Sequence, residues 1–190
     1  MNTSPRAAIL HGVFMRVHGS GVLLSGASGV GKSELALELL ARGHALVADD
    51  AVEFRLRHGT LIGHAPRLLR GFLEARSLGI LNIRRLYGPR SIAGRCRLDL
   101  VLRLDAARGT PDSGLERLSG RRGHVSILGV EIAEITIPIR LGHNLAVLVE
   151  TACRDLQLRS GGYRADDDLS TRQAREMARQ AQHGHRQNSS

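Results

Sequence analysis

One eight-residue segment, residues 26–33, constrains the fold of this 190-residue chain more than any other feature of its sequence. It reads Gly26-Ala27-Ser28-Gly29-Val30-Gly31-Lys32-Ser33 and fits GxxxxGK(S/T), the pattern of phosphate-binding loops. An apolar run at residues 22–24 predicts a strand before the loop, and leucines at helical spacing predict a helix after it, over residues 34–42. Because this motif requires a strand before it and a helix after it, the segment predicts an α/β fold.

The loop carries the groups that bind the phosphates of a nucleotide. Its backbone N–H groups and the N-terminus of the following helix both favour anions. We expect the ammonium of Lys32 to contact the β and γ phosphates, and the hydroxyl of Ser33 to ligate Mg²⁺. We therefore predict that ATP and Mg²⁺ bind here, although outside this strand and helix context the same residues would form only a glycine-rich turn.

The rest of the chain alternates strand and helix patterns. We expect strands at residues 8–17, 45–48, 52–56, 97–104, 125–128 and 132–139, and helices at residues 68–74 and 171–182. Residues 145–152 fit either element, and the chain beyond about residue 165 is dominated by Asp, Arg, Gln, His and Ser. The sequence thus predicts one α/β domain over residues 1–165 and a polar tail or helix over residues 166–190.

The charge balance limits the partners of the chain. Its 27 basic and 18 acidic residues give a formal net charge of +9, which attracts phosphorylated ligands, acidic protein faces, nucleic acid or anionic lipid. Nucleic acid is not expected, because the arginines are scattered and no aromatic residues lie between them for base stacking. No segment approaches the ~20 apolar residues of a membrane span, so no membrane partner is expected either.

Cysteine usage and the N-terminal sequence indicate a cytoplasmic protein. Cys96 and Cys153 form no CxxC pair, and the spacing of the residues shows no disulfide framework and no cluster of zinc ligands. The first six residues are polar and are not followed by an apolar export signal.

Two adjacent carboxylates, Asp49 and Asp50, follow the strand expected at residues 45–48. A carboxylate at the end of a strand can point toward a nucleotide crevice, and near an acceptor hydroxyl it can take the proton during phosphoryl transfer. Two close carboxylates also raise each other's pKa, which helps one of them to act as a base at neutral pH. Taken without the loop, such a pair is more often a solvated turn or a helix cap.

Several segments also follow one order and spacing along the chain. They are His11-Gly12, the loop with Glu34 after it, RGHALVADD at residues 42–50, LEARSLGILNI at residues 73–83 with Leu86-Tyr87-Gly88 after it, and PIRLGHNLA at residues 138–146. Over about residues 10–165 the chain thereby resembles HPr kinase/phosphorylase, whose second signature is written LEIRGLGIINV. The resemblance implies a P-loop kinase domain with a mixed sheet, locally similar to phosphoenolpyruvate carboxykinase.

The resemblance also implies an activity and a set of site residues. The family uses ATP and Mg²⁺ to phosphorylate a serine of the phosphocarrier HPr, removes that phosphate by phosphorolysis, and forms homohexamers. By position, Asp50 would accept the proton in phosphorylation and donate it in the reverse reaction. His11, Lys32 and Arg117 would be catalytic, and Ser33 and Glu74 would hold Mg²⁺.

Three departures from the family pattern bear on this expectation. Ser77 stands where the signature has Gly, and His143 stands where the segment associated with dephosphorylation has Arg. A neutral His143 lacks the fixed charge and planar fork of arginine, so the sequence predicts kinase activity and leaves phosphorylase activity open. Only about ten residues precede His11, so we expect the N-terminal domain of the larger family form to be absent.

Two alternatives of other classes remain. One is a P-loop small-molecule kinase, against which stands the limited room for a substrate lid in 190 residues. The other is an ATP-binding regulatory module with weak or lost catalysis, against which stand the intact Asp50, Lys32 and Ser33.

Overall fold

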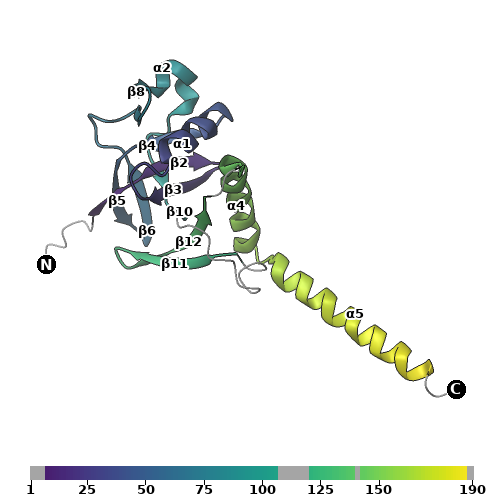
Figure 1. Cartoon of the computed structure of the whole chain (residues 1–190). Coiled ribbons are helices and arrows are strands. Elements are labelled where there is room, and N and C mark those ends of the chain that lie inside the picture. Colours follow the sequence, from purple (N-terminus) through teal and green to yellow (C-terminus); the bar gives the residue numbers. More distant parts are fainter. Residues whose placement is uncertain (1–6, 107–119, 140–141, 188–190) are drawn as a thin grey trace, which may run out of the picture.

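The computed structural model describes residues 7–106, 120–139 and 142–187 (Figure 1). In chain order they form β1 (Ala7–His11), β2 (Val13–Val17), β3 (Ser20–Gly26), α1 (Lys32–Ala41), β4 (Ala45–Ala48), β5 (Ala51–Arg57), β6 (Thr60–His64), β7 (Phe72–Ala75), β8 (Gly79–Asn82), α2 (Ile83–Tyr87), the 3₁₀ helix η1 (Pro89–Ser91), β9 (Cys96–Arg97), β10 (Leu100–Asp105), β11 (Arg122–Ile127), β12 (Val130–Pro138), α4 (Leu145–Ser160) and α5 (Ala165–Gln187). None of the helices in these ranges combines the length and apolar content needed to cross a bilayer.

The larger sheet has six strands in the order β11-β12-β10-β3-β2-β4. Strand β10 runs parallel to both β3 and β12, whereas the β2–β3, β2–β4 and β11–β12 pairs are antiparallel. The first five residues of β3 are buried, as expected for a strand covered on both faces. The predicted α/β fold with a mixed sheet is therefore confirmed.

Two apolar layers cover the two faces of this sheet. On one face Leu24 packs in a cluster with buried residues of α1 and α4, such as Leu39 and Val149. On the other face the adjacent Leu23 packs in a cluster with the smaller sheet, whose strand order is β1-β5-β6-β9. The side-chain alternation of a strand thus serves both layers, as expected for residues on opposite faces of a pleat. The helix α5 extends away from these layers (Figure 1).

The chain passes twice between the two sheets at one place. Strand β1 lies in the smaller sheet and β2 in the larger, and the chain crosses between them at Gly12. The return crossing, from β4 to β5, is made by Asp49 and Asp50, and the N–H of Gly12 donates to the carbonyl of Asp50 at 3.2 Å. A Cβ at Gly12 would lie 2.5 Å from the carbonyl oxygen of Leu24, so only glycine fits.

Five expectations about the elements need correction or completion. The strand expected at residues 8–17 is two strands, β1 and β2, in different sheets. The strand expected at residues 97–104 is likewise divided, because β9 belongs to the smaller sheet and β10 to the larger. The helix expected at 68–74 is wrong: Gly71 has φ +81° and the following residues form strand β7. Residues 145–152 begin the helix α4, capped by the Asn144 side chain, and the helix expected at 171–182 is part of α5.

The two sheets meet tightly at Gly21, where β3 passes the β9–β10 connection. The N–H of Gly21 donates to Asp99 Oδ2 at 2.8 Å, and the N–H of Asp99 donates to the Gly21 carbonyl at 2.8 Å. A Cβ at Gly21 would lie 1.8 Å from the carbonyl oxygen of Arg97, which is backbone and cannot move aside cheaply.

We expect Gly21→Ala to lower the free energy of unfolding by about 3 kcal/mol, because the added methyl forces the two sheets apart. Urea denaturation followed by circular dichroism measures this loss. Gly94→Ala is the matched control, since a Cβ there meets no atom within 4 Å, and it should change stability by less than ~0.5 kcal/mol. Equal losses in the two variants would contradict this account of the junction.

The thiol of Cys153, in α4, gives a second prediction. Burial raises its pKa to about 12, so at pH 8 only roughly one thiol in 10⁴ is the reactive thiolate. We expect iodoacetamide to label Cys153 very slowly in the native protein and rapidly in urea, as followed by peptide mass mapping. Native labelling of Cys153 at the rate of the unfolded chain would show that this helix face is not packed as described.

Candidate functional site

The loop at residues 26–33 lies between β3 and α1, as its motif predicts. Gly29 and Gly31 have φ of +76° and +98°, values that L side chains rarely adopt. Gly26 also has a positive φ, +138°, and a Cβ there would lie 2.5 Å from the carbonyl oxygen of Leu104 on the neighbouring strand. Helix α1 begins at Lys32, so the loop leads directly into the helix N-terminus, where free N–H groups favour an anion.

The ammonium of Lys32 is turned back onto the loop. Its Nζ donates to the carbonyl oxygens of Gly26 at 3.0 Å and of Ala27 at 2.9 Å. Both acceptors are neutral, so an anionic phosphate in the loop would be a stronger partner for the same charge. Two of the predicted loop residues, Ala27 and Val30, do not line the cleft beside the loop. The carbonyl of Ala27 accepts the hydrogen bond from Lys32, and the side chain of Val30 packs against the core.

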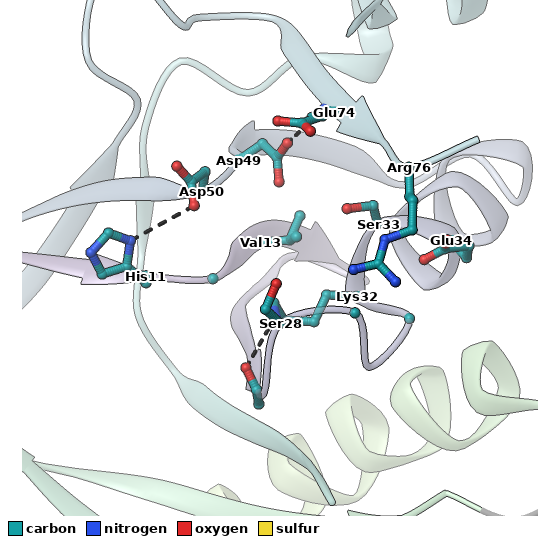
Figure 2. Close-up of a pocket in the computed structure, with 14 residues that line it drawn as sticks. His11, Val13, Ser28, Lys32, Ser33, Glu34, Asp49, Asp50, Glu74 and Arg76 are labelled. Atoms are coloured by element: carbon teal, nitrogen blue, oxygen red, sulfur yellow. Dashed lines mark hydrogen bonds and ion pairs between the residues drawn. The ribbon is translucent and has the colours of Figure 1, made fainter. Parts of the chain in front are cut away.

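Three carboxylates lie across the cleft from the loop, as Figure 2 shows. Asp49 and Asp50 come from the crossing between the sheets, and Glu74 comes from β7. Asp49 Oδ2 accepts a hydrogen bond of 2.7 Å from the N–H of Glu74, which joins the crossing to β7. Burial raises the pKa of the Asp49 carboxyl above its ordinary value, although hydrogen bonds from the Glu74 and Asp50 backbones oppose this shift.

Asp50 differs from Asp49 in being open to solvent. Its backbone has φ +61°, which Asp tolerates better than most residues, and its side chain is 80% exposed. His11, the last residue of β1, is 82% exposed, and its Nδ1 lies 3.7 Å from Asp50 Oδ1. The crossing therefore presents an accessible carboxylate and an imidazole as neighbours at the mouth of the cleft.

Together these residues line one cleft of about 530 Å³. Its lining residues are His11, Gly12, Val13, Gly26, Ser28, Gly29, Gly31, Lys32, Ser33, Glu34, Asp49, Asp50, Glu74 and Arg76. One wall offers N–H donors and a lysine, and the other offers carboxylate oxygens. Such an arrangement can bind a phosphate chain beside a group that takes a proton. The oxygens of Ser33, Asp49 and Glu74 are also the hard ligands that Mg²⁺ prefers, so the residues present fit that ion.

Arg76 lines the cleft, and the sequence analysis did not identify it as a candidate site residue. It follows β7, and its guanidinium lies over the loop, so that a Cβ on Gly29 would be 3.0 Å from one of its terminal nitrogens (Figure 2). Arg76 makes no ion pair with the described parts of the chain. Its place in LEARSLGILNI could have pointed to it. Arg76 comes two residues after Glu74, and alternate residues of an extended segment lie on the same side.

Two other residues singled out in the sequence do not line the cleft, and a third cannot be placed. Arg117 lies outside the described residues, so its position is untested. His143 is exposed just before the Asn144 cap of α4, and Ser77 is exposed after Arg76; neither lines the cleft.

Comparison with known proteins gives consistent matches. The family described as HPr Serine kinase C-terminal domain matches residues 3–173. The HPr kinase/phosphorylase of Neisseria meningitidis serogroup A is 45% identical over 182 residues, and that of Neisseria gonorrhoeae strain FA 1090 is 51% identical over 160 residues. These alignments cover 95% and 83% of this chain but 57% and 50% of the relatives, so the chain spans about half their length.

A solved structure agrees with these sequence matches. The Hpr(Ser) kinase/phosphatase from Coxiella burnetii superposes with a TM-score of 0.77 at 31% sequence identity. The match covers 87% of this chain and 97% of that one.

Replacing Arg76 with Met removes the guanidinium but keeps an apolar side chain of similar length. We expect a fluorescent ATP analogue to bind this variant roughly tenfold more weakly, the effect of losing one charge-assisted contact of about 1.5 kcal/mol. Lys32→Met should weaken binding at least as much. The control Arg84→Met removes an exposed arginine of α2 outside the cleft and should bind normally. Normal binding by Arg76→Met would show that this arginine does not face the phosphates.

Proposed function

Because this chain belongs to the HPr serine kinase C-terminal domain family, we propose that it is an ATP- and Mg²⁺-dependent protein kinase that phosphorylates a serine of an HPr-type phosphocarrier. One observation of the site carries the proposal: the cleft joins a phosphate-binding loop to the 80% exposed carboxylate of Asp50. A serine on the surface of a folded protein can reach such a group. A small-molecule kinase instead excludes water from its acceptor by closing around it.

The chain's own residues divide the work of the transfer. The loop N–H groups, Lys32 and Arg76 bind and orient the triphosphate and offset the charge of the transferred group. Asp50 accepts the proton of the serine hydroxyl while the serine oxygen bonds to the γ-phosphorus. The bond from that phosphorus to the bridging β,γ-oxygen breaks, and ADP leaves. The neighbouring His11 orients Asp50.

Mg²⁺ would be held by Ser33 and Glu74, with Asp49 as a further oxygen ligand. When bound, the ion would supply positive charge that offsets the negative charge of the phosphates. The raised pKa of Asp49 fits this role, because a carboxylate that burial makes costly to ionise is stabilised by a nearby cation.

The reverse reaction and two further expectations are part of the proposal. An oxygen of inorganic phosphate would bond to the phosphorus of the phosphoserine, and the bond from that phosphorus to the serine oxygen would break. Asp50 would return the proton to the serine oxygen, and pyrophosphate would leave. Since His143 replaces the arginine of the family segment, we propose phosphorolysis only as a weaker activity. By its position in the family pattern, Arg117 is a further catalytic residue. By the same resemblance, the chain assembles as a homohexamer.

The test is incubation of the chain with ATP, Mg²⁺ and the HPr-type phosphocarrier of the same organism, followed by mass spectrometry of the phosphocarrier. We expect one added phosphate, located on serine. Asp50→Asn should lower the rate at least about 10²-fold, since it removes the base and keeps the shape. Asp167→Asn, an exposed aspartate of α5, is the control and should react normally. An unmodified phosphocarrier, despite measurable ATP binding, would reject the proposal in favour of another acceptor or a regulatory module.

A further inference from the structure

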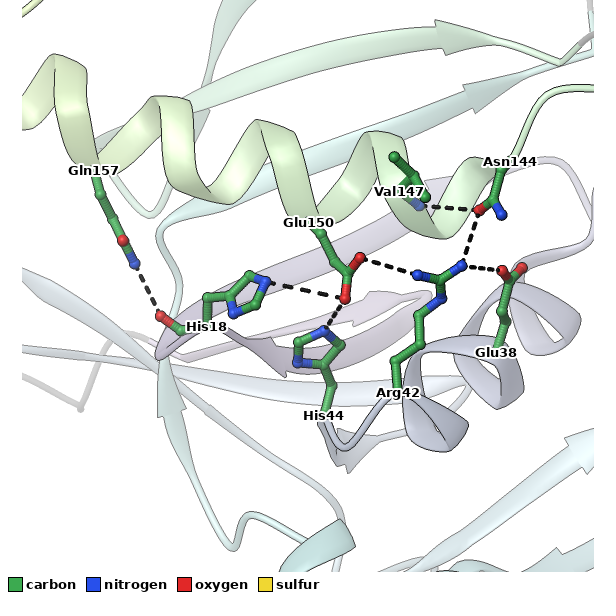
Figure 3. Close-up of polar contacts among 8 residues, drawn as sticks. All are labelled: His18, Glu38, Arg42, His44, Asn144, Val147, Glu150 and Gln157. Carbon is green, nitrogen blue, oxygen red and sulfur yellow. Dashed lines mark hydrogen bonds and ion pairs between the residues drawn. The ribbon is translucent and has the colours of Figure 1, made fainter.

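A second polar cluster, outside the loop cleft, joins three segments of the chain on the helix-covered face. His18 lies in the β2–β3 turn, His44 lies between α1 and β4, and Glu150 lies on α4. Figure 3 shows both imidazoles pointing toward the Glu150 carboxylate. His44 Nε2 is 2.8 Å from Glu150 Oε1, and His18 Nε2 is 4.0 Å from the same oxygen. One ligand atom from each residue lies within 4.8 Å of the other two.

We propose that His18, His44 and Glu150 form a binding site for a divalent transition metal ion of the Zn²⁺ type. Two imidazoles and one carboxylate are a ligand set that Zn²⁺ accepts, leaving a fourth position open. Mg²⁺ and Ca²⁺ prefer oxygen ligands alone, so the set distinguishes this site from the loop cleft. Among the described residues, this is the one group of three or more His, Cys, Asp or Glu with such spacing.

The ligands are held in place by contacts outside the cluster. Arg42 Nη1 donates to Glu150 Oε2 at 3.3 Å, which leaves Oε1 directed at the two imidazoles. Gln157 Nε2 donates at 2.9 Å to the carbonyl of His18, which fixes the turn that carries this residue. Such outer contacts orient metal ligands before an ion binds. The rings of His18 and His44 already lie edge to face, with centroids 4.8 Å apart.

The cluster is sheltered but can be reached from solvent. The side chain of His44 is 8% exposed, that of Glu150 20% and that of His18 29%. A cavity of about 340 Å³ is lined by His18, His44 and the nearby Arg16 and Arg42. This cavity opens onto both imidazoles, though not onto Glu150, and so gives an ion a path to them from solvent. The positive charge of Arg42 opposes a cation, but Glu38 and Glu150 both pair with it.

The spacing of residues in the sequence gave no cluster of zinc ligands, and the structure shows why. His44 and Glu150 are 106 residues apart, and His18 comes from a third segment. Fixed-spacing patterns detect ligands on one or two neighbouring elements, whereas this set needs the packing of α4 on the sheet. A bound ion would tie the helix that follows the phosphate loop to α4 and so stabilise the fold.

The test is titration of the protein with Zn²⁺ by calorimetry, and with Co²⁺ by visible absorption, in excess Mg²⁺ to saturate the loop cleft. All proteins carry His183→Ala and His185→Ala, because these two histidines near the C-terminus could bind metal independently. We expect one Zn²⁺ per chain with micromolar or tighter affinity, Co²⁺ bands of a low-coordinate site, and a higher Tm with Zn²⁺. None of these readouts depends on the proposed kinase activity.

The chain offers a closely matched pair of variants. His18 and His58 each precede a glycine in a hairpin turn and share φ 48°, a conformation that Asn also adopts. We expect His18→Asn to weaken Zn²⁺ binding at least tenfold and to abolish the Tm increase, and Glu150→Gln to do the same. His58→Asn should behave as the parent protein. Equal Zn²⁺ binding by His18→Asn and His58→Asn, or no binding by the parent, would overturn the proposal and leave a structural hydrogen-bonded cluster.

Discussion

The hydrogen bond from the N–H of Gly12 to the carbonyl of Asp50 joins the two places where the chain crosses between the sheets, and the position of both sheets follows from these crossings. At this point the chain passes twice between the sheets, once in each direction. Both passages need unusual backbone, a glycine pressed against the Leu24 carbonyl and an aspartate at φ +61°. They place His11, Asp49 and Asp50 at the edge of the larger sheet beside the loop. The connection between the sheets and the candidate site thus share the same residues.

Much of this arrangement could be predicted from the sequence because its signals are local. Each of these signals is contained in a short stretch of sequence: the loop motif, the strand before it, the helix after it and the acidic pair after β4. The strand pattern could not show that Gly12 divides residues 8–17 between two sheets, because alternation is the same in either sheet. The helix expected at residues 68–74 was wrong because Leu68 and Leu69 resemble a helical face, yet Leu68 is 86% exposed. The place of Arg76 over the loop and the ion pairs of Glu150 arise only through packing between distant segments.

One edge of the larger sheet and its helix-covered face serve different purposes. At one edge, the sheet crossings build an open site where charges on opposite walls face each other across a cleft. On the helix-covered face, the His18, His44 and Glu150 cluster holds α4 to the turn after α1. Because α1 begins at Lys32, the same helix joins the phosphate loop at one end to this cluster at the other. The open site needs accessible groups, and the side chain of Asp50 is 80% exposed. The cluster needs sheltered groups, and the side chain of His44 is 8% exposed.

If the loop binds a nucleoside triphosphate with its γ-phosphate facing the carboxylates, a crystal structure of the chain with Mg²⁺ and a non-hydrolysable ATP analogue will reveal that arrangement. We expect the β and γ phosphates to lie on the N–H groups of residues 29–33. We also expect Lys32 Nζ to have moved from the Gly26 and Ala27 carbonyls to the phosphates, with the γ-phosphate directed toward Asp50. An analogue bound elsewhere, or a Lys32 that keeps its two carbonyl contacts beside a filled loop, would contradict it.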